Sequence, residues 1–207
     1  MIYPSGGKLK HNKAGFTLLE LVTSMSLIVI ITTIFIANYR SSNRRTDLVM
    51  TAQKLVADIH MAQNNALGLV KYGGEVPEGG WGIHFDKFEP NHYILFADLN
   101  KPESNDPWDI YAADPSYMYY DAGEGEVGLG ARIIDLPTGV EITSLEITST
   151  DAQSNIVNVT FLPPDPKTNI FNEIATSTFL KIGLRDAREG TVKTVRVNFL
   201  GLVEVID

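Results

Sequence analysis

The chain has 207 residues, of which 44% are hydrophobic, and a formal net charge of −8 at pH 7. This length suggests one globular domain with appendages, and the excess of acidic residues argues against a general nucleic-acid surface, which requires a basic patch. The absence of cysteine excludes disulfide bonds and thiolate metal sites.

The most informative stretch is an apolar run close to the N-terminus. Residues 16–37 contain no Lys, Arg, Asp, Gly or Pro, and Glu20 is the only charged residue among them. A helix of about 20 apolar residues crosses the hydrocarbon core of a bilayer, so we expect a membrane-spanning helix over residues 16–38. A carboxylate in such a helix costs roughly 2.5–3.5 kcal/mol on insertion scales, which makes Glu20 a candidate functional residue.

The segment before the run is a short leader that contains three lysines. A secretory signal peptide has a small-residue cleavage site after its apolar core. Here the small residues Ala14 and Gly15 lie before the run, and Asn38 follows it. Hydropathy by itself therefore leaves open an uncleaved signal anchor.

Residues 13–21, Lys-Ala-Gly-Phe-Thr-Leu-Leu-Glu-Leu, resemble the class III signal of type IV prepilins and of the pseudopilins of type II secretion. The resemblance implies that a membrane-embedded prepilin peptidase cuts between Gly15 and Phe16. It implies further that the same enzyme methylates Phe16, and that residues 1–15 are a leader peptide. It also implies that Glu20 pairs with the terminal amine of a neighbouring subunit during filament assembly.

Elementary physics agrees with this role for Glu20. The residue lies one helical turn from Phe16 and near the positive end of the helix dipole. A buried carboxylate needs a cationic partner, and a freed terminal ammonium is a suitable one. The alternative is that Glu20 extends to the membrane interface or pairs with the amine of its own chain.

Basic residues do not decide the orientation, because three precede the run and Arg40, Arg44 and Arg45 follow it. The resemblance implies a single-pass inner-membrane protein with a cytoplasmic N-terminus and an extracytoplasmic C-terminal domain, which then joins a pilus or pseudopilus. The expected partners are prepilin peptidase, other pilin or pseudopilin subunits, the inner-membrane assembly platform and the lipid bilayer. Loss of the three leader lysines would change the net charge to −11.

The helix is predicted to continue past the membrane run. Apolar residues recur there at steps of four and three, which indicates one stripe of an amphipathic helix: Leu48, Ala52, Leu55, Ile59, Ala62 and Ala66. Residues 16–67 contain no Gly or Pro, and Gly68 is a plausible stop. We expect one helix over residues 16–67, with residues 39–68 as its amphipathic continuation.

Residues 69–207 are predicted to form an antiparallel β domain. Residues 81–86 and 91–98 read as a hairpin, and further strands are expected at 131–136, 140–147, 156–162, 178–184, 192–199 and 202–206. Residues 99–128 are expected to be a long exposed loop. A long helix followed by an antiparallel sheet predicts an α+β fold, pilin-like, with the helix covering one face of the sheet.

The resemblance extends more loosely into this domain. Residues 159–165 and 195–205, with a turn at Gly201, are similar to the C-terminal sheet of the H-type minor pseudopilins, the GspH/FimT group. No nucleophile, nucleotide or zinc motif occurs in the sequence, so we expect neither enzymatic activity nor a cofactor.

Two sets of residues could form metal sites. His84 and His92 could approach one another across the hairpin, although solvent-facing histidines are the simpler interpretation. The loop after the hairpin has the oxygen-rich composition of calcium loops but lacks the EF-hand spacing; its candidates are Asp98, Asn100, Asp106 and Asp109. A plain solvated loop is the simpler interpretation there too.

The sequence therefore favours a structural subunit, a minor pilin or pseudopilin. It does not separate a pilus subunit from a secretion pseudopilin. The alternative from another class is a membrane-anchored extracytoplasmic binding domain with an uncleaved anchor.

Overall fold

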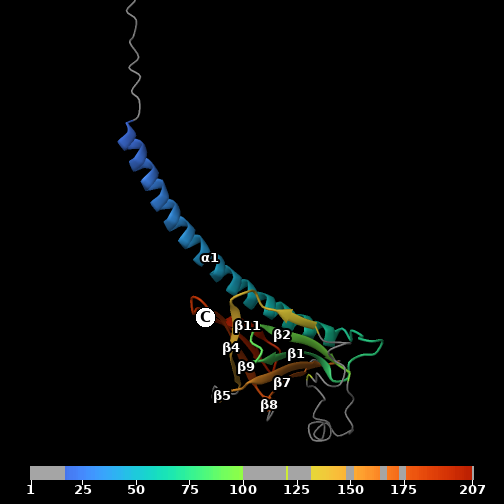
Figure 1. The fold of residues 1–207 in the computed structure, drawn as a ribbon. Coiled ribbons are helices and arrows are strands. Elements are labelled where there is room, and N and C mark those ends of the chain that lie inside the picture. Colours follow the sequence, from blue (N-terminus) through green and yellow to red (C-terminus); the bar gives the residue numbers. More distant parts are fainter. Residues whose placement is uncertain are drawn as a thin grey trace, which may run out of the picture. The chain divides into compact units, whose positions relative to one another are not determined.

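The computed structural model of the chain describes residues 17–99, 120, 132–147, 152–163, 167–172 and 176–206. The chain divides into two compact units, residues 1–43 and residues 44–207. Helix α1 (Leu18–Leu67) begins in the first unit and ends in the second, and all the described strands belong to the second unit (Figure 1).

The part of α1 in the second unit carries the predicted apolar stripe. All six residues of the stripe are at most 1% exposed: Leu48, Ala52, Leu55, Ile59, Ala62 and Ala66. Their steps of four and three place them on one side of a helix with 3.6 residues per turn. The predicted helix and its buried stripe are thus confirmed.

The helix ends in a hydrogen-bonded cap directly after Leu67. The N–H of Val70 donates to the carbonyl oxygen of Asn65 at 2.9 Å, and the N–H of Leu69 donates to that of Ala66 at 3.2 Å. These two bonds define a Schellman motif. Its left-handed residue is Leu69, with φ of 48°, although glycine is usual at this position because a Cβ is strained there. The predicted stop, Gly68, lies one residue earlier.

One antiparallel sheet of six strands forms around the predicted hairpin. Its order is β3 (Arg132–Asp135), β2 (His92–Asp98), β1 (Gly80–Asp86), β6 (Ile156–Leu162), β7 (Lys167–Asn172) and β8 (Thr176–Ser177). We call it the first sheet. Trp81 lies opposite Ala97 in the hairpin, which confirms that prediction. On its other edge β1 pairs with β6, so that Ile83 lies opposite Val159.

A second antiparallel sheet has five strands. Its order is β11 (Val203–Ile206), β10 (Val192–Asn198), β9 (Phe179–Asp186), β4 (Val140–Ile147) and β5 (Ala152–Gln153). The register of β4 against β9 shifts between Ile142 and Ser144, which marks a bulge. Strands β10 and β11 form the predicted hairpin around Gly201, with Val195 opposite Val205.

The division into two sheets corrects the expectation of one sheet. The turn at residues 137–139 does not join neighbours, because β3 pairs with β2 in the first sheet and β4 pairs with β9 in the second. Strands β5, β7 and β8 were also missed. The sequence of β7 is Lys-Thr-Asn-Ile-Phe-Asn, and it is held in place by pairing with β6 rather than by a strong apolar alternation.

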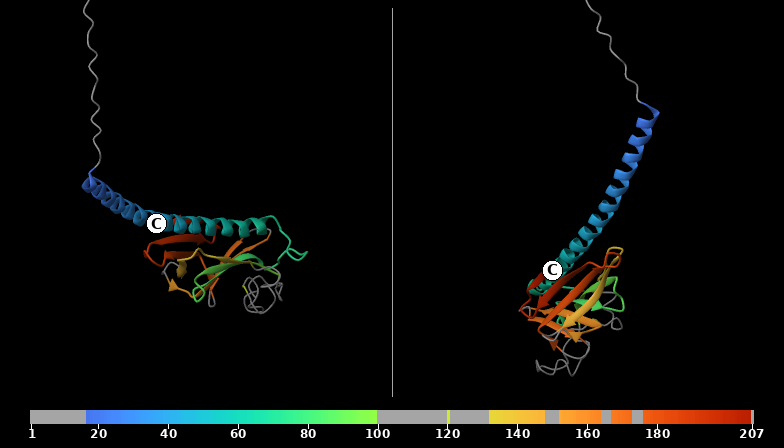
Figure 2. Two further views of the ribbon diagram at one scale, coloured as in Figure 1. Left: turned by 45° about the horizontal axis from the view of Figure 1, so that its top comes forward. Right: turned by 90° about the vertical axis from the view of Figure 1, so that its left-hand side faces the viewer.

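A single core joins the helix stripe to both sheets. It includes Ile83 and Phe85 of β1, Ile182 and Leu184 of β9, and Val197 of β10, all fully buried. Figure 2 shows the second-unit part of α1 lying along the strands. The α+β architecture with antiparallel sheets is therefore confirmed, with two sheets sharing the core under the helix.

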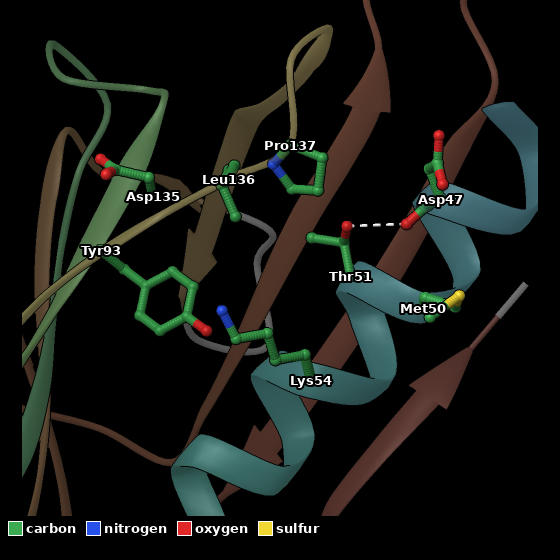
Figure 3. Close-up of a pocket in the computed structure, with 8 residues that line it drawn as sticks. All are labelled: Asp47, Met50, Thr51, Lys54, Tyr93, Asp135, Leu136 and Pro137. Carbon is green, nitrogen blue, oxygen red and sulfur yellow. Dashed lines mark hydrogen bonds between the residues drawn. The ribbon is translucent and has the colours of Figure 1, made fainter.

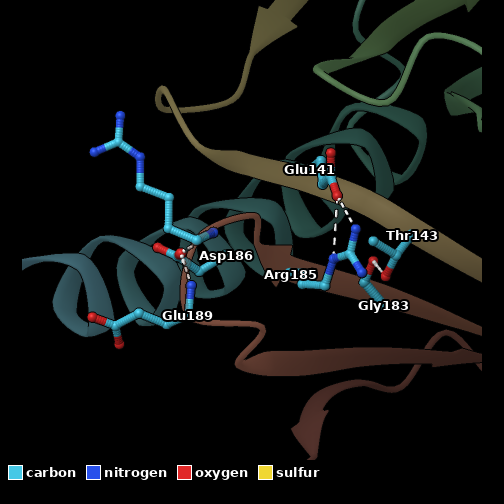
Figure 4. Close-up of polar contacts among 7 residues, drawn as sticks. Glu141, Thr143, Gly183, Arg185, Asp186 and Glu189 are labelled. Carbon is cyan, nitrogen blue, oxygen red and sulfur yellow. Dashed lines mark hydrogen bonds and ion pairs between the residues drawn. The ribbon is translucent and has the colours of Figure 1, made fainter. Parts of the chain in front are cut away.

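Polar contacts link two strands of the second sheet and order one of its turns (Figure 4). The Nε of Arg185 on β9 donates to Oε1 of Glu141 on β4 at 3.2 Å. In the turn after β9, Oδ1 of Asp186 accepts the backbone N–H groups of Arg188 at 2.8 Å and of Glu189 at 2.9 Å. This carboxylate thereby fixes the turn that leads into β10.

Candidate functional site

The start of α1 is organised by Thr17. Its backbone carbonyl accepts the N–H of Leu21 at 3.2 Å, and its Oγ1 accepts the N–H of Glu20 at 3.2 Å. Thr17 is therefore the N-cap, and Thr-x-x-Glu is the spacing of a capping box. This role of Thr17 was not predicted, although its spacing to Glu20 was a signal for it.

The stretch Leu18–Ile36 is long and apolar enough to cross a membrane by length and composition, and none of it is buried. Leu18 is 83% exposed and Phe35 is 72% exposed. A helix that is apolar on all sides needs lipid or other protein around it. This surface is consistent with a protein that is anchored in a membrane.

The hydroxyl groups of this segment bond to their own helix. Each donates to a backbone carbonyl three or four residues earlier, at 2.7 to 3.0 Å: Thr23 and Ser24 to Glu20, Ser26 to Val22, Thr32 to Ile28, and Thr33 to Val29. Such back-bonding satisfies a hydroxyl that has no water available. None of these five side chains therefore requires a polar partner from another helix.

The carboxylate of Glu20 is different. It is exposed and forms no ion pair with any residue that the structure describes. Within an apolar environment an ionised carboxylate must be paired with a cation or lose its charge. Its position at the third residue of the helix also lets the helix dipole favour the negative charge. The Glu20 carboxylate can therefore pair with a cation that approaches the start of the helix.

Residues 10–36 match the family model of the prokaryotic N-terminal methylation motif. The matched range contains Gly15, Phe16 and Glu20 together with the apolar stretch of α1. This motif supports a similarity to type IV prepilin-like proteins over the N-terminal segment. Comparison with curated proteins and with solved structures gave no match.

The predicted cleavage and methylation residues, Gly15 and Phe16, lie outside the described residues. Of the four calcium candidates, Asn100, Asp106 and Asp109 also lie outside them. Asp98 ends strand β2 and is fully buried, and its carbonyl oxygen accepts the N–H of Gly79 at 3.1 Å. Asp98 therefore belongs to the strand predicted over residues 91–98, and its burial shows that it does not lie in a solvated loop with the other three candidates.

Over the part of the chain that the structure describes, no group of three His, Asp or Glu side chains is arranged to hold a metal ion. The two strand histidines have separate partners. Nδ1 of His84 donates to Oδ1 of Asn158 at 2.8 Å, and the His84 ring lies 4.7 Å from the ring of Tyr120. Nε2 of His92 lies 3.1 Å from Oε2 of Glu89.

The expectation that both histidines face solvent is wrong for His84, which is 9% exposed. Burial on the outer face of the first sheet lowers the pKa of its imidazole, because a charged ring would lose its hydration there. The hydrogen bond to Asn158 opposes this shift. A strand alternation cannot reveal such burial, since it shows which residues share a face but not what covers that face.

One part-buried hydrogen bond links the helix to the first sheet. The hydroxyl of Tyr93 on β2 donates to Oδ2 of Asp58 on α1 at 2.5 Å. Burial, and then the adjacent Asp58 carboxylate, raise the pKa of Tyr93 far above its ordinary value. The phenol therefore stays protonated and remains a donor. This bond specifies how the second-unit part of α1 sits on the sheet.

Proposed function

We propose that the chain is a structural subunit of a type IV pilus or of a type II secretion pseudopilus. In this proposal prepilin peptidase cleaves between Gly15 and Phe16 and methylates Phe16. The observation that carries it is the exposed Glu20 carboxylate, inside a methylation motif and without an ion-pair partner among the described residues. The terminal ammonium of a neighbouring subunit would supply the missing cation.

Assembly then depends on packing between apolar helices. The side chains of α1 form a shallow hollow that an apolar side chain from another helix can fill, lined by Val22, Met25, Ser26, Val29 and Ile30. Small residues such as Ser26 let helices approach closely in a membrane. Because the hydroxyl of Ser26 already bonds to Val22, this contact would rest on van der Waals packing.

The finer assignments follow from the same proposal. The chain is a minor subunit most similar to the H-type pseudopilins, and its role is structural rather than enzymatic. It inserts once into the inner membrane with an extracytoplasmic β domain, and it is extracted into the filament by the assembly platform. The C-terminal hairpin around Gly201 supports the H-type assignment.

The test substitutes the carboxylate. Glu20→Ala is expected to leave the chain inserted in the membrane but to reduce its amount in sheared filaments at least about tenfold, because one buried ion pair is lost. Thr32→Ala is the matched control, since the Thr32 hydroxyl bonds only to Ile28 of its own helix among the described residues. Equal incorporation of both variants would remove the pairing role of Glu20.

The same cells distinguish the alternative of an uncleaved anchor. Intact-mass spectrometry of the wild-type chain is expected to find an N-terminus at a methylated Phe16. A chain that retains residues 1–15 in the presence of prepilin peptidase would instead favour a membrane-anchored extracytoplasmic binding domain.

A further inference from the structure

Strand β11 forms one edge of the second sheet, and β10 is its neighbour there. The other described edges of the two sheets are β3, β5 and β8. Strands β5 and β8 have two residues each, and β3 has exposed charged residues at both ends, Arg132 and Asp135. Short length and charge are common protections of an edge against further pairing. Strand β11 is longer than β5 and β8 and has one charged residue, Glu204, so it is the least protected of these edges.

Some backbone groups of β11 point away from the sheet. The N–H of Asn198 donates to the carbonyl oxygen of Leu202 at 3.1 Å, so these two residues form a hydrogen-bonded pair. Bonded and non-bonded pairs alternate along an antiparallel ladder, so Glu204 is bonded to β10, whereas Val203 and Val205 are not. The N–H and carbonyl groups of Val203 and Val205 therefore face outward. Among the described residues, none forms a hydrogen bond with these outward groups.

Exposed apolar side chains surround the outward groups. Val205 lies opposite Val195, which is fully buried, yet Val205 itself is 40% exposed. The core is therefore open at this edge. The turn before β11 adds Phe199, Leu200 and Leu202, which are 55%, 73% and 55% exposed. Unpaired backbone groups beside exposed apolar side chains are the features by which a sheet edge binds an extended segment. We call residues 202–206 the open edge.

A groove between α1 and the first sheet is another exposed feature of this unit (Figure 3). Its cavity has a volume of about 410 Å³, and its lining includes Asp47, Lys54, Tyr93 and Asp135. Figure 3 shows the ring of Tyr93 facing the helix from the side of the sheet. Because the groove carries two carboxylates and one ammonium group, its charges do not select one class of ligand. The open edge carries a single charge at a defined position, and that position discriminates between partners.

The position of Glu204 disfavours a second copy of the chain as the partner. Two open edges that pair antiparallel use all their outward groups only when Val203 of each lies opposite Val205 of the other. Glu204 then lies opposite Glu204 of the other copy, in a non-bonded pair, where side chains are closest, and like charges directly opposite are destabilising. Arg196 of β10 pairs with Glu204 and offsets part of this repulsion, but the net charge of −8 adds to it. A strand with Lys or Arg at this position is instead attracted.

We propose that the open edge accepts an extended segment of another protein as a sixth strand of the second sheet, antiparallel to β11. In this segment a basic residue lies opposite Glu204, and apolar residues lie opposite Val203 and Val205. The two apolar side chains cover the exposed part of Val205 on the inward face, while the basic residue lies on the outward face with Glu204. Hydrogen bonds to the outward backbone groups and this apolar contact supply the affinity. The inference rests on the second sheet and does not require the proposed function.

Hydrogen exchange tests the contact in the full chain. The probe is the peptide Thr-Val-Lys-Val-Thr, acetylated and amidated at its ends, added at millimolar concentration to the isotope-labelled chain in detergent. NMR is expected to show exchange slowed at least about fivefold at the amides of Val203 and Val205, because these N–H groups gain acceptors. Exchange at Glu204 and Ile206 should change much less, because these amides are already bonded to β10. The matched peptide Thr-Val-Glu-Val-Thr should require an about fivefold higher concentration for the same effect.

Three variants separate the backbone contact from the charge contact. Val205→Pro removes an outward N–H but no bond to β10, and proline is tolerated at such edge positions; it is expected to weaken binding of the lysine peptide at least about tenfold. Val205→Thr keeps the N–H and the branched shape, so binding should stay within about twofold. Glu204→Gln should make the two peptides bind equally well, which a purely structural role of Glu204 would not do.

A tethered strand measures the same contact without depending on the affinity of a short peptide. The segment Asn-Gly-Thr-Thr-Val-Lys-Val-Thr is joined after Asp207, so that its Asn-Gly turn brings the lysine opposite Glu204. Tethering gives a millimolar effective concentration, and docking is expected to raise the Tm of the chain by about 3 °C. The same segment with Glu in place of Lys, or the lysine segment combined with Val205→Pro, should give less than about half of this rise.

Either effect supports the inference if Val205→Pro removes it. Absence of both effects would overturn it. Exchange at Val203 and Val205 that is already slow in the dilute chain alone would also overturn it, because the chain would then cover its own edge. Slow exchange that appears only as the chain concentration rises, together with a dimer in analytical ultracentrifugation, would show that a second copy occupies the edge instead. None of these measurements uses filaments, so the open edge and the proposed function are judged separately.

Discussion

Residues 18–36 and residues 44–67 of α1 share one backbone conformation, yet their apolar side chains have opposite surroundings. Leu27 is 59% exposed, whereas Leu55 is fully buried. In the first stretch apolar residues cover all sides of the helix, and in the second they form one stripe. The comparison shows that the β domain supplies the apolar environment of the second stretch, while the first must find lipid or other subunits.

The largest expected effect comes from removing the same leucine side chain in the two stretches of α1. Leu55→Ala is expected to lower the free energy of unfolding of the β domain by about 2–5 kcal/mol, because it leaves a cavity in the shared core. Leu27→Ala is the matched control and should change that value by less than about 0.5 kcal/mol. Denaturant unfolding of the full chain in detergent measures both. Equal effects would mean that the two stretches do not differ as described.

A smaller effect is expected when a hydroxyl group is removed from the second unit rather than from the apolar stretch of α1. Tyr93→Phe removes the hydrogen bond to Asp58, and we expect a loss of about 1–2 kcal/mol in the free energy of unfolding. The control is Thr32→Val, since the Thr32 hydroxyl bonds to its own helix; its effect on the β domain should be negligible. In the double variant Tyr93→Phe/Asp58→Asn the two losses should not add. Additive losses would mean that the bond does not link the helix to the sheet.

The end of α1 allows a gain in stability. Leu69 adopts φ of 48° and is largely exposed, so Leu69→Gly should relieve strain and raise the free energy of unfolding by about 1 kcal/mol. Gln63→Gly, one turn inside the helix, should lower it by a similar amount. Thermal unfolding of both variants checks the two signs. Destabilisation by Leu69→Gly would show that the cap does not strain the chain.

The smallest effect concerns pH. Burial lowers the pKa of His84 in the folded chain, so the unfolded chain binds the proton first as the pH falls. His84 therefore contributes full stability above its ordinary pKa of about 6.5 and loses part of it below that value. Unfolding at pH 7.5 and pH 5.5 should show a smaller pH dependence in His84→Gln than in the wild-type chain. An unchanged pH dependence would contradict the buried, neutral state of His84.

Several features of the fold could be predicted because they depend on neighbours in the sequence. The end of α1 at Leu67 and the strands β4 and β6 follow from the spacing of apolar residues and from the breaker residues beside them. The two short strands β5 and β8 have two residues each, too few to show any alternation. Strand β7 is mostly polar, and its partner β6 defines it.

Some features of the candidate site could also be predicted from local patterns, and others could not. Glu20 could be identified because it interrupts an apolar run, and Thr17 could have been identified from its spacing to Glu20. The contact between Tyr93 and Asp58 joins residues 35 positions apart, and no local pattern encodes it. The hydrogen bond of His84 likewise reaches Asn158, 74 positions away.

Local sequence patterns were enough to locate a single carboxylate at the start of an apolar helix and the buried stripe that follows it. Both depend on helical periodicity, which is a local property of the chain. Long-range contacts determine that the strands form two sheets and that β3 and β4 belong to different ones. Strand alternation is compatible with either sheet, so the choice depends on long-range pairing and on how all the elements fill one core.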